Sequence, residues 1–166
     1  MYHTVQEFLE DWRFEVEKTR TILAALTDEA LNQKVWAEGR TLQTLAWHIV
    51  RSISEMMGRV GFVLEGPLET SPETASAGGI RAGYADLTAS LDRQLQEHWT
   101  DEDLQREHDM YGKMWSNAKT LKVLVVHEIH HRGQLTVLMR QAGLKVPGIY
   151  GPAREEWSSC GLPPHP

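Results

Sequence analysis

Three of the chain's eight histidines lie within five consecutive positions, in the segment His127-Glu128-Ile129-His130-His131. His127 and His131 are four residues apart, so an α-helix places their side chains one above the other, with Cβ atoms roughly 5–6 Å apart. Two imidazoles held in this way can bind one metal ion if a third ligand comes from elsewhere. The same residues match the pattern H-E-x-x-H, a signature of zinc hydrolases. The segment therefore predicts a metal site. It is either a histidine pair completed by a third ligand from elsewhere or the centre of a zinc hydrolase.

A further histidine stands beside the apolar stripe of an earlier predicted helix. His48 shares a flank of that helix with Leu45 and Ser52, so it is expected to point towards a neighbouring helix. With His127 and His131 it would form a three-histidine site that keeps open coordination positions, as a catalytic metal requires. Zinc, nickel, iron and manganese all accept imidazole, which leaves the identity of the divalent metal open. Without a metal, these histidines would be hydrogen-bonded core residues.

The residues around the two histidines have less specific interpretations. Glu128 could orient a ligand or act as a base, but a surface salt bridge is the simpler expectation. Arg132 and Gln134 could anchor a substrate carboxylate or bond to a ligand, whereas an arginine on a helix is usually solvated. Gly133 inside a helix costs about 1 kcal/mol relative to alanine, which predicts a close helix crossing or room beside a metal. Outside this segment, the tryptophans, including Trp36, are expected mostly to be packing residues, with Trp47 and Trp115 the candidates to line a pocket near the site. Asp109 and Tyr111 could reach the open end of the bundle, where a substrate would enter.

Four segments with apolar residues every three or four positions predict the α-helices that hold these side chains. Thr41 is the expected N-cap of the second helix, Ser116 or Asn117 that of the fourth, and Gly143 the terminator of the fourth. The helices are expected over about residues 5–26, 41–64, 80–99 and 117–142.

The segments between the helices show no strand pattern. Residues 65–79 and 101–114 are expected to be long loops, the latter with a turn at Tyr111-Gly112-Lys113, and residues 146–152 are expected to run extended. The predicted fold class is therefore all-α, a four-helix bundle with long inter-helix loops, in a single domain over residues 1–166.

Composition excludes several classes of partner. The 17 basic and 23 acidic residues give a net charge of −6, which offers no electrostatic footprint for nucleic acid or an anionic membrane. No apolar stretch approaches the ~18–20 residues that a membrane helix needs. Cys160 is the one cysteine, so no intrachain disulfide can form, and charged residues within the first ten positions are unlike a signal peptide. We expect a soluble cytoplasmic protein with neither nucleic-acid nor membrane partners.

The motifs resemble those of the DinB (damage-inducible, YfiT-like) metalloprotein superfamily, in order and spacing, over essentially the whole chain. The matching segments are Thr41-Leu42, Trp47-His48-Ile49-Val50, His127-Glu128-Ile129-His130-His131-Arg132-Gly133-Gln134-Leu135 and Gly143-Leu144-Lys145-Val146-Pro147. The resemblance implies an up-down-down-up bundle, commonly a homodimer, with one divalent metal bound by His48, His127 and His131. Related members are thiol S-transferases or thiol-dependent isomerases that use thiols such as bacillithiol or mycothiol. The resemblance therefore predicts a metal-dependent transferase acting on a small-molecule thiol and an electrophile.

Two alternatives stand beside this prediction. In a zinc hydrolase, Glu128 would be the general base and Glu155 or Glu156 the third ligand. However, no strand pattern precedes the last helix, and the sequence continues Arg132-Gly133-Gln134 without the further glycine and histidine of metzincins. In a non-enzymatic bundle, the metal would be structural or incidental, and the protein would serve dimerisation or the binding of a small ligand.

Overall fold

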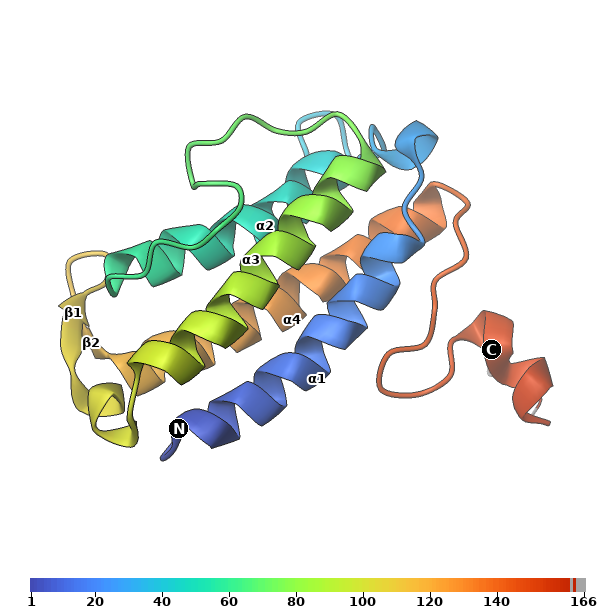
Figure 1. Ribbon diagram of the computed structural model, residues 1–166. Helices are drawn as coiled ribbons and strands as arrows, with labels where there is room; N and C mark the ends of the chain where they lie inside the picture. Colours follow the sequence, from blue (N-terminus) through green and yellow to red (C-terminus); the bar gives the residue numbers. More distant parts are fainter. Residues whose placement is uncertain (162, 164–166) are drawn as a thin grey trace.

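The computed structural model describes residues 1–161 and residue 163 of the chain. Four long helices form a bundle: α1 (Val5–Ala24), α2 (Leu42–Arg59), α3 (Ala77–His98) and α4 (Asn117–Gln141). They run up, down, down and up, so the crossover between α2 and α3 must return along the length of the bundle (Figure 1). The prediction of an all-α, up-down-down-up four-helix bundle with long connections is confirmed. The sequence after Pro163 also predicts a frayed tail, and residues 164–166 lie outside the described part of the chain.

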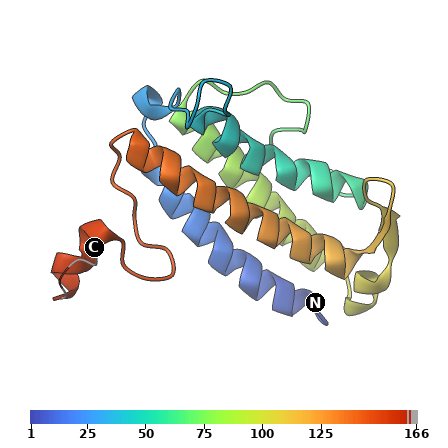
Figure 2. The ribbon, with the colours of Figure 1, turned by 180° about the vertical axis from the view of Figure 1, so that it is seen from behind.

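The helices are arranged so that each packs against two others. α4 contacts α2 and α1, and α3 contacts the same two helices from the other side. Figure 2 shows α4 between α2 and α1 on the face turned towards the viewer. One continuous hydrophobic core fills the interior, and its largest fully buried side chains include Trp12, Tyr84 and Phe8. None of the helices in this part of the chain is long and apolar enough to cross a membrane.

The helix ends are set by local hydrogen bonds, and most fall where the sequence predicts. Thr41 accepts a hydrogen bond from Thr44 N at the start of α2, and Ser116 caps α4 in the same way through Lys119 N. Gly143, with φ +77°, follows α4, where Leu144 N bonds to Met139 O. This is the Schellman pattern, in which glycine takes the left-handed conformation just past the helix.

Two helix boundaries differ from the prediction. α2 ends at Arg59 and not near residue 64, because Gly61, with φ +97°, builds a second Schellman turn in which Phe62 N bonds to Met57 O. The sequence predicts a later end because apolar residues continue beyond this turn. α3 begins at Ala77, three residues early, because Ser76 caps Gly79 N and Asp28 accepts from Ala77 N.

The connection between α3 and α4 contains a short hairpin that the sequence pattern did not show. β1 (Glu107–Asp109) and β2 (Met114–Ser116) pair antiparallel after a 3₁₀-helix, η2 (Asp101–Gln105). Strands of three residues are too short to show alternation. The turn expected at Tyr111-Gly112-Lys113 is confirmed: Tyr111 and Gly112 both have positive φ, 61° and 77°, as a type I′ hairpin turn requires.

The remaining short elements are 3₁₀-helices. η1 (Asp28–Ala30) lies between α1 and α2, and η3 (Arg154–Cys160) follows the segment after α4. The segment of residues 146–152 contains no helix, as predicted, whereas η3 was not predicted.

A buried polar network joins α4 to α1 and to the C-terminal segment. The Arg132 guanidinium pairs with Glu15 and donates hydrogen bonds to Thr19 Oγ1 and to Tyr150 Oη, and the side chains of Arg132 and Glu15 are only 3% and 9% exposed. Tyr150 Oη in turn donates to Glu15 at 2.7 Å. The expectation that Arg132 is solvated is therefore wrong, because helical periodicity alone does not reveal which polar residues face a neighbouring helix.

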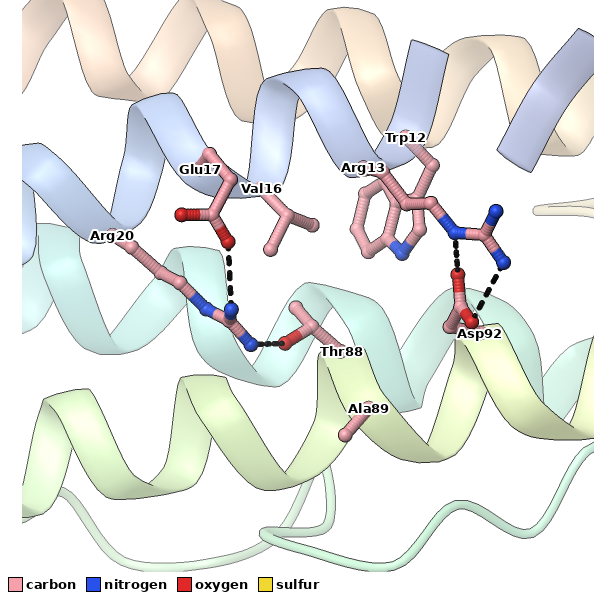
Figure 3. A pocket seen from close by; sticks show the side chains of 8 residues that line it. All are labelled: Trp12, Arg13, Val16, Glu17, Arg20, Thr88, Ala89 and Asp92. Carbon is pink, nitrogen blue, oxygen red and sulfur yellow. Dashed lines mark hydrogen bonds and ion pairs between the residues drawn. The ribbon is translucent and has the colours of Figure 1, made fainter. Parts of the chain in front are cut away.

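The side of the bundle formed by α1 and α3 carries charges that are already paired. A pocket of about 340 Å³ lies between α1 and α3 (Figure 3). Among the residues that line it, Arg13 donates two hydrogen bonds to the carboxylate of Asp92, at 2.6 and 3.0 Å. Arg20 pairs with Glu17 and donates a hydrogen bond to Thr88. Each arginine thus has a carboxylate partner from the protein.

We expect Arg132→Met to lower the free energy of unfolding by about 3–5 kcal/mol, because it leaves Glu15 buried without a counter-charge. Arg140→Met is the matched control: Arg140 also pairs with a carboxylate, that of Glu155, but its side chain is 44% exposed. Such a surface pair contributes about 0–1 kcal/mol. Urea unfolding measures both, and equal losses would contradict the structural role of the buried pair.

Candidate metal centre

The three predicted ligands come together in the groove between α2 and α4. His127 Nε2 lies 3.2 Å from His48 Nε2 and 3.1 Å from His131 Nε2. One nitrogen from each ring falls within 4.8 Å of the other two. The antiparallel packing of α2 on α4 brings His48 opposite the two histidines that lie one turn apart on α4.

This geometry fits one metal ion. With metal–nitrogen bonds of 2.0–2.1 Å and tetrahedral angles, two ligand nitrogens should stand about 3.3 Å apart. In a set of neutral rings without a cation, His127 Nε2 could donate its proton to only one of its two neighbours. The other short contact would then have no proton to share, whereas a cation bound between the rings would satisfy all three nitrogens. The donor set therefore suits a divalent metal.

A neighbouring amide holds His131 in the tautomer that a ligand needs. Gln134 Oε1 lies 2.8 Å from His131 Nδ1, and Gln134 Nε2 lies 3.1 Å from His130 Nε2. The amide oxygen can only accept, so the proton of His131 is on Nδ1 and the lone pair of Nε2 faces the other two histidines. Gln134 thus has the orienting role that the sequence left open, and His130 is exposed and outside the trio.

The surroundings keep the three imidazoles neutral. Burial, followed by the other histidines, lowers the pKa of His48 to about 4. Burial and then His131 lower the pKa of His127 to about 4, and burial also lowers the pKa of His131. Neutral imidazole is the metal-binding form, so at neutral pH the three rings do not have to lose protons to bind an ion.

Glu128 is not part of this centre. Its side chain is 2% exposed and points away from His127, towards α1 and α3. Oε1 accepts hydrogen bonds from Thr19 and Tyr84, both at 2.7 Å, and burial raises the pKa of the carboxyl group. The expectation of a surface salt bridge is wrong, and this orientation removes the general base that a zinc hydrolase of the H-E-x-x-H type would need.

The other acidic candidates are engaged elsewhere. Glu155 pairs with Arg140, and Glu156 accepts from the backbone N–H groups of Gly148 and Ala153. Neither belongs to the group of side chains that could share a metal. In the described part of the chain, the only potential ligands grouped closely enough to share an ion are the three histidines.

The predicted lining of the site is partly wrong. Tyr111 does line a pocket beside His48 and His127, but Asp109 accepts from Gly112 N within the hairpin turn. Trp47 is buried on the side of Gly83, and Trp115 packs against Tyr111 outside the pocket. Trp36 lines a second pocket beside His131, although its position between helices gave no pattern from which to predict this.

The two reasons expected for Gly133 are also wrong. A Cβ atom added there would meet no atom within 4 Å, so neither a close helix crossing nor room for a metal requires glycine at this position. No contact in the structure accounts for it.

The lowered histidine pKa values predict how the metal-free protein responds to acid. The unfolded chain takes up protons below about pH 6.5, whereas folded His48 and His127 remain neutral down to about pH 4. Stability should therefore fall as the pH falls through this window. We expect the urea midpoint of chelator-treated protein to drop between pH 7 and pH 5, and to drop less in the double variant His48→Gln/His127→Gln. Equal slopes would contradict the burial of these rings.

Comparisons with known proteins identify the family of this chain. The family model described as "DinB family" matches residues 1–164. The protein YrdA of Bacillus subtilis strain 168 is 41% identical over 162 residues, which cover 98% of this chain and 97% of YrdA.

Two solved structures of bacterial proteins have a similar fold. A DinB-like protein from Bacillus cereus ATCC 10987 is 43% identical, with a TM-score of 0.86 over 90% of this chain and 100% of that one. YfiT from Bacillus subtilis, described as "a probable metal-dependent hydrolase with an unusual four-helix bundle topology", shares the fold at 19% identity, with a TM-score of 0.63 over 85% of this chain and 89% of YfiT. The family match and the identity to YrdA together show that the chain belongs to the DinB family.

Proposed function

We propose that this protein is a divalent-metal-dependent thiol S-transferase, which joins the sulfur of a low-molecular-weight thiol to an electrophilic carbon of a second small molecule. The observation that carries the proposal is the convergence of His48, His127 and His131, without a carboxylate, in a groove with a pocket on either side.

The donor set favours an anionic sulfur ligand. Three neutral imidazoles leave both positive charges of a divalent ion uncompensated, and a thiolate would neutralise one of them. When bound, the metal would act as a Lewis acid that lowers the pKa of a thiol, as metals do for coordinating cysteine. The residues of the chain would hold the ion, expose it to the groove and position the two reactants next to it.

The reaction is a substitution at carbon. With monochlorobimane as the electrophile, the sulfur lone pair forms the new carbon–sulfur bond while the carbon–chlorine bond breaks. Chloride leaves with the bonding electrons, and the proton of the thiol passes to solvent. No step requires a protein base next to the sulfur, which agrees with the orientation of Glu128 away from the site.

Two other functions have less support. Hydrolysis, the activity named for YfiT, needs an activated water and usually a general base, but Glu55 in the adjacent pocket is already bound by Arg59 and Tyr111. A purely structural metal is disfavoured because structural zinc sites usually close with four protein ligands, whereas three group together here.

Metal binding should depend on His48 as strongly as on the pair on α4. We expect His48→Gln to lower the metal content from about one ion per chain to near zero, because two imidazoles alone form a weak site. His130→Gln is the matched control, since His130 is exposed and outside the trio. Zinc titration of chelator-treated protein measures both. Full stoichiometry in the His48 variant would mean that the third ligand lies elsewhere.

Zinc-loaded protein should conjugate a thiol to monochlorobimane, with the activity lost on chelation and restored by added metal. Glutathione, bacillithiol and mycothiol are the thiols to compare by bimane fluorescence.

Glu128→Gln serves as the control for this assay. It removes the base of the H-E-x-x-H mechanism but not a ligand, so we expect it to retain thiol transfer. Absence of metal-dependent conjugation with all three thiols would rule out the transferase proposal and leave the metal site in place.

A further inference from the structure

The groove between α2 and α4 is divided by the histidine trio into two compartments of different character. The polar compartment, about 500 Å³, is lined by His48 and His127 together with Arg51, Glu55, Arg59 and Tyr111. The apolar compartment, about 470 Å³, is lined by His131 with Val35, Trp36, Leu45, Val137 and Leu138. The first follows the groove towards the end of α2, and the second follows it towards the start of α2.

In the polar compartment one arginine is free to bind an anion. Arg59 is paired with Glu55 at 2.6 Å and stacks on the ring of Tyr111, whose hydroxyl donates to the same carboxylate. Arg51 has no ion pair in the described chain: Nη1 donates to Ser71 O at 3.3 Å, and Nε is buried without an acceptor among those residues. Buried donors are usually satisfied, so this guanidinium fits a carboxylate of a bound molecule.

Charge around this position supports the same assignment. Arg51 follows His48 by three residues on α2 and lines the same compartment as His48 and His127, so it lies beside the metal centre. Glu69, the other acid of the compartment, acts on Arg59 and Tyr111. No ion pair joins Glu69 to Arg51 in the described part of the chain, so a thiol that carries a carboxylate could place its sulfur at the trio and its acid group on Arg51.

The apolar compartment has a buried floor and exposed walls. Leu45 and Leu138 are 4% and 3% exposed, whereas Trp36 and Val137 are 62% and 52% exposed. Glu38 and Arg40, which also line it, carry opposite charges. An uncharged aromatic or alkyl body would cover these apolar walls, while its reactive carbon would face His131 and the metal centre.

Neither compartment of the groove is lined by a cysteine that could carry the transferred group between two separate half-reactions. Cys160, the one cysteine of the chain, is exposed in η3 and lines neither compartment. In the direct substitution proposed above, both reactants must be present together.

Resting on the proposed function, we propose that the groove binds its two reactants at the same time on opposite sides of the histidine trio. Arg51 holds the carboxylate of the thiol in the polar compartment, and the walls formed by Trp36 and Val137 hold the uncharged body of the electrophile in the apolar compartment.

The role of Arg51 is tested with a pair of thiols that differ only in the acid group. N-acetylcysteine and its methyl ester are titrated into zinc-loaded protein by calorimetry. We expect Arg51→Gln to weaken binding of the acid about tenfold or more and to leave binding of the ester unchanged within about twofold. Arg51→Lys should restore part of the difference, and Arg93→Gln, an exposed arginine on α3, should change neither. Equal effects on acid and ester would overturn the assignment of Arg51.

The apolar compartment is tested without any reaction, using the unreactive fluorophore syn-(methyl,methyl)bimane. We expect Val137→Asp to weaken its binding about tenfold, and Val126→Asp, an equally exposed valine of α4 outside the groove, to leave it unchanged. Saturating N-acetylcysteine should change the affinity less than twofold, because the two molecules occupy different compartments.

Competition between the two ligands, or no binding of the bimane, would overturn the proposal. So would a change in oligomeric state of Trp36→Ala on sedimentation, since the walls would then belong to an interface between copies. These binding results do not depend on turnover, so a failure of thiol transfer itself can be told apart from a failure of the two-compartment model.

Discussion

The rotation of α4 about its own axis is the constraint on which the site depends. The segment His127-Glu128-Ile129-His130-His131-Arg132 contains two pairs spaced four residues apart, and the second pair is offset from the first by one residue, or about 100°. The histidine pair faces α2, whereas Glu128 and Arg132 face α1 and α3. Because Glu128 and Arg132 are buried, α4 could turn only by unpairing them, which is costly in a low-dielectric interior. The buried pairs on one side thereby hold the histidines in place on the other.

The order of the helices explains why the groove is available for binding. In the up-down-down-up arrangement α2 is antiparallel to α4. It lies diagonally across the bundle from α1, the helix that precedes it in the sequence. The long segment between α2 and α3 returns outside the bundle, and the hairpin before α4 folds over the end of α2, where Tyr111 bonds to Glu55. That tyrosine has a left-handed backbone, which is unusual for a bulky residue and is held here by the hairpin turn and the Glu55 contact. The connections thus build the ends of the groove, and the helices build its middle.

The failures of sequence interpretation have a common cause. Glu128 and Arg132 were assigned to the surface because charged residues on helices are usually exposed, and nothing local distinguishes a charge that meets a partner 109 or 117 positions away. Trp36 and Trp47 were both expected to be packing residues with Trp47 near the site, yet Trp36 lines the groove and Trp47 packs elsewhere. Their placement depends on how a loop and a helix meet their neighbours. The early start of α3 is similarly settled by a tertiary hydrogen bond, that from Ala77 N to Asp28.

Periodicity, caps and spacing are local properties, and they were enough to predict the helices, the caps at Thr41 and Ser116, the stop at Gly143 and the histidines that share a face of α4. His48 could be nominated as the third member because it flanks an apolar stripe. Whether its ring nitrogen comes within 3.2 Å of His127 Nε2 depends on the register of α2 against α4, which no short stretch of sequence encodes. The same holds for the division of the groove and for the direction in which Glu128 points. Those features arise from contacts between residues far apart in the chain, and such contacts exist only once the helices have packed.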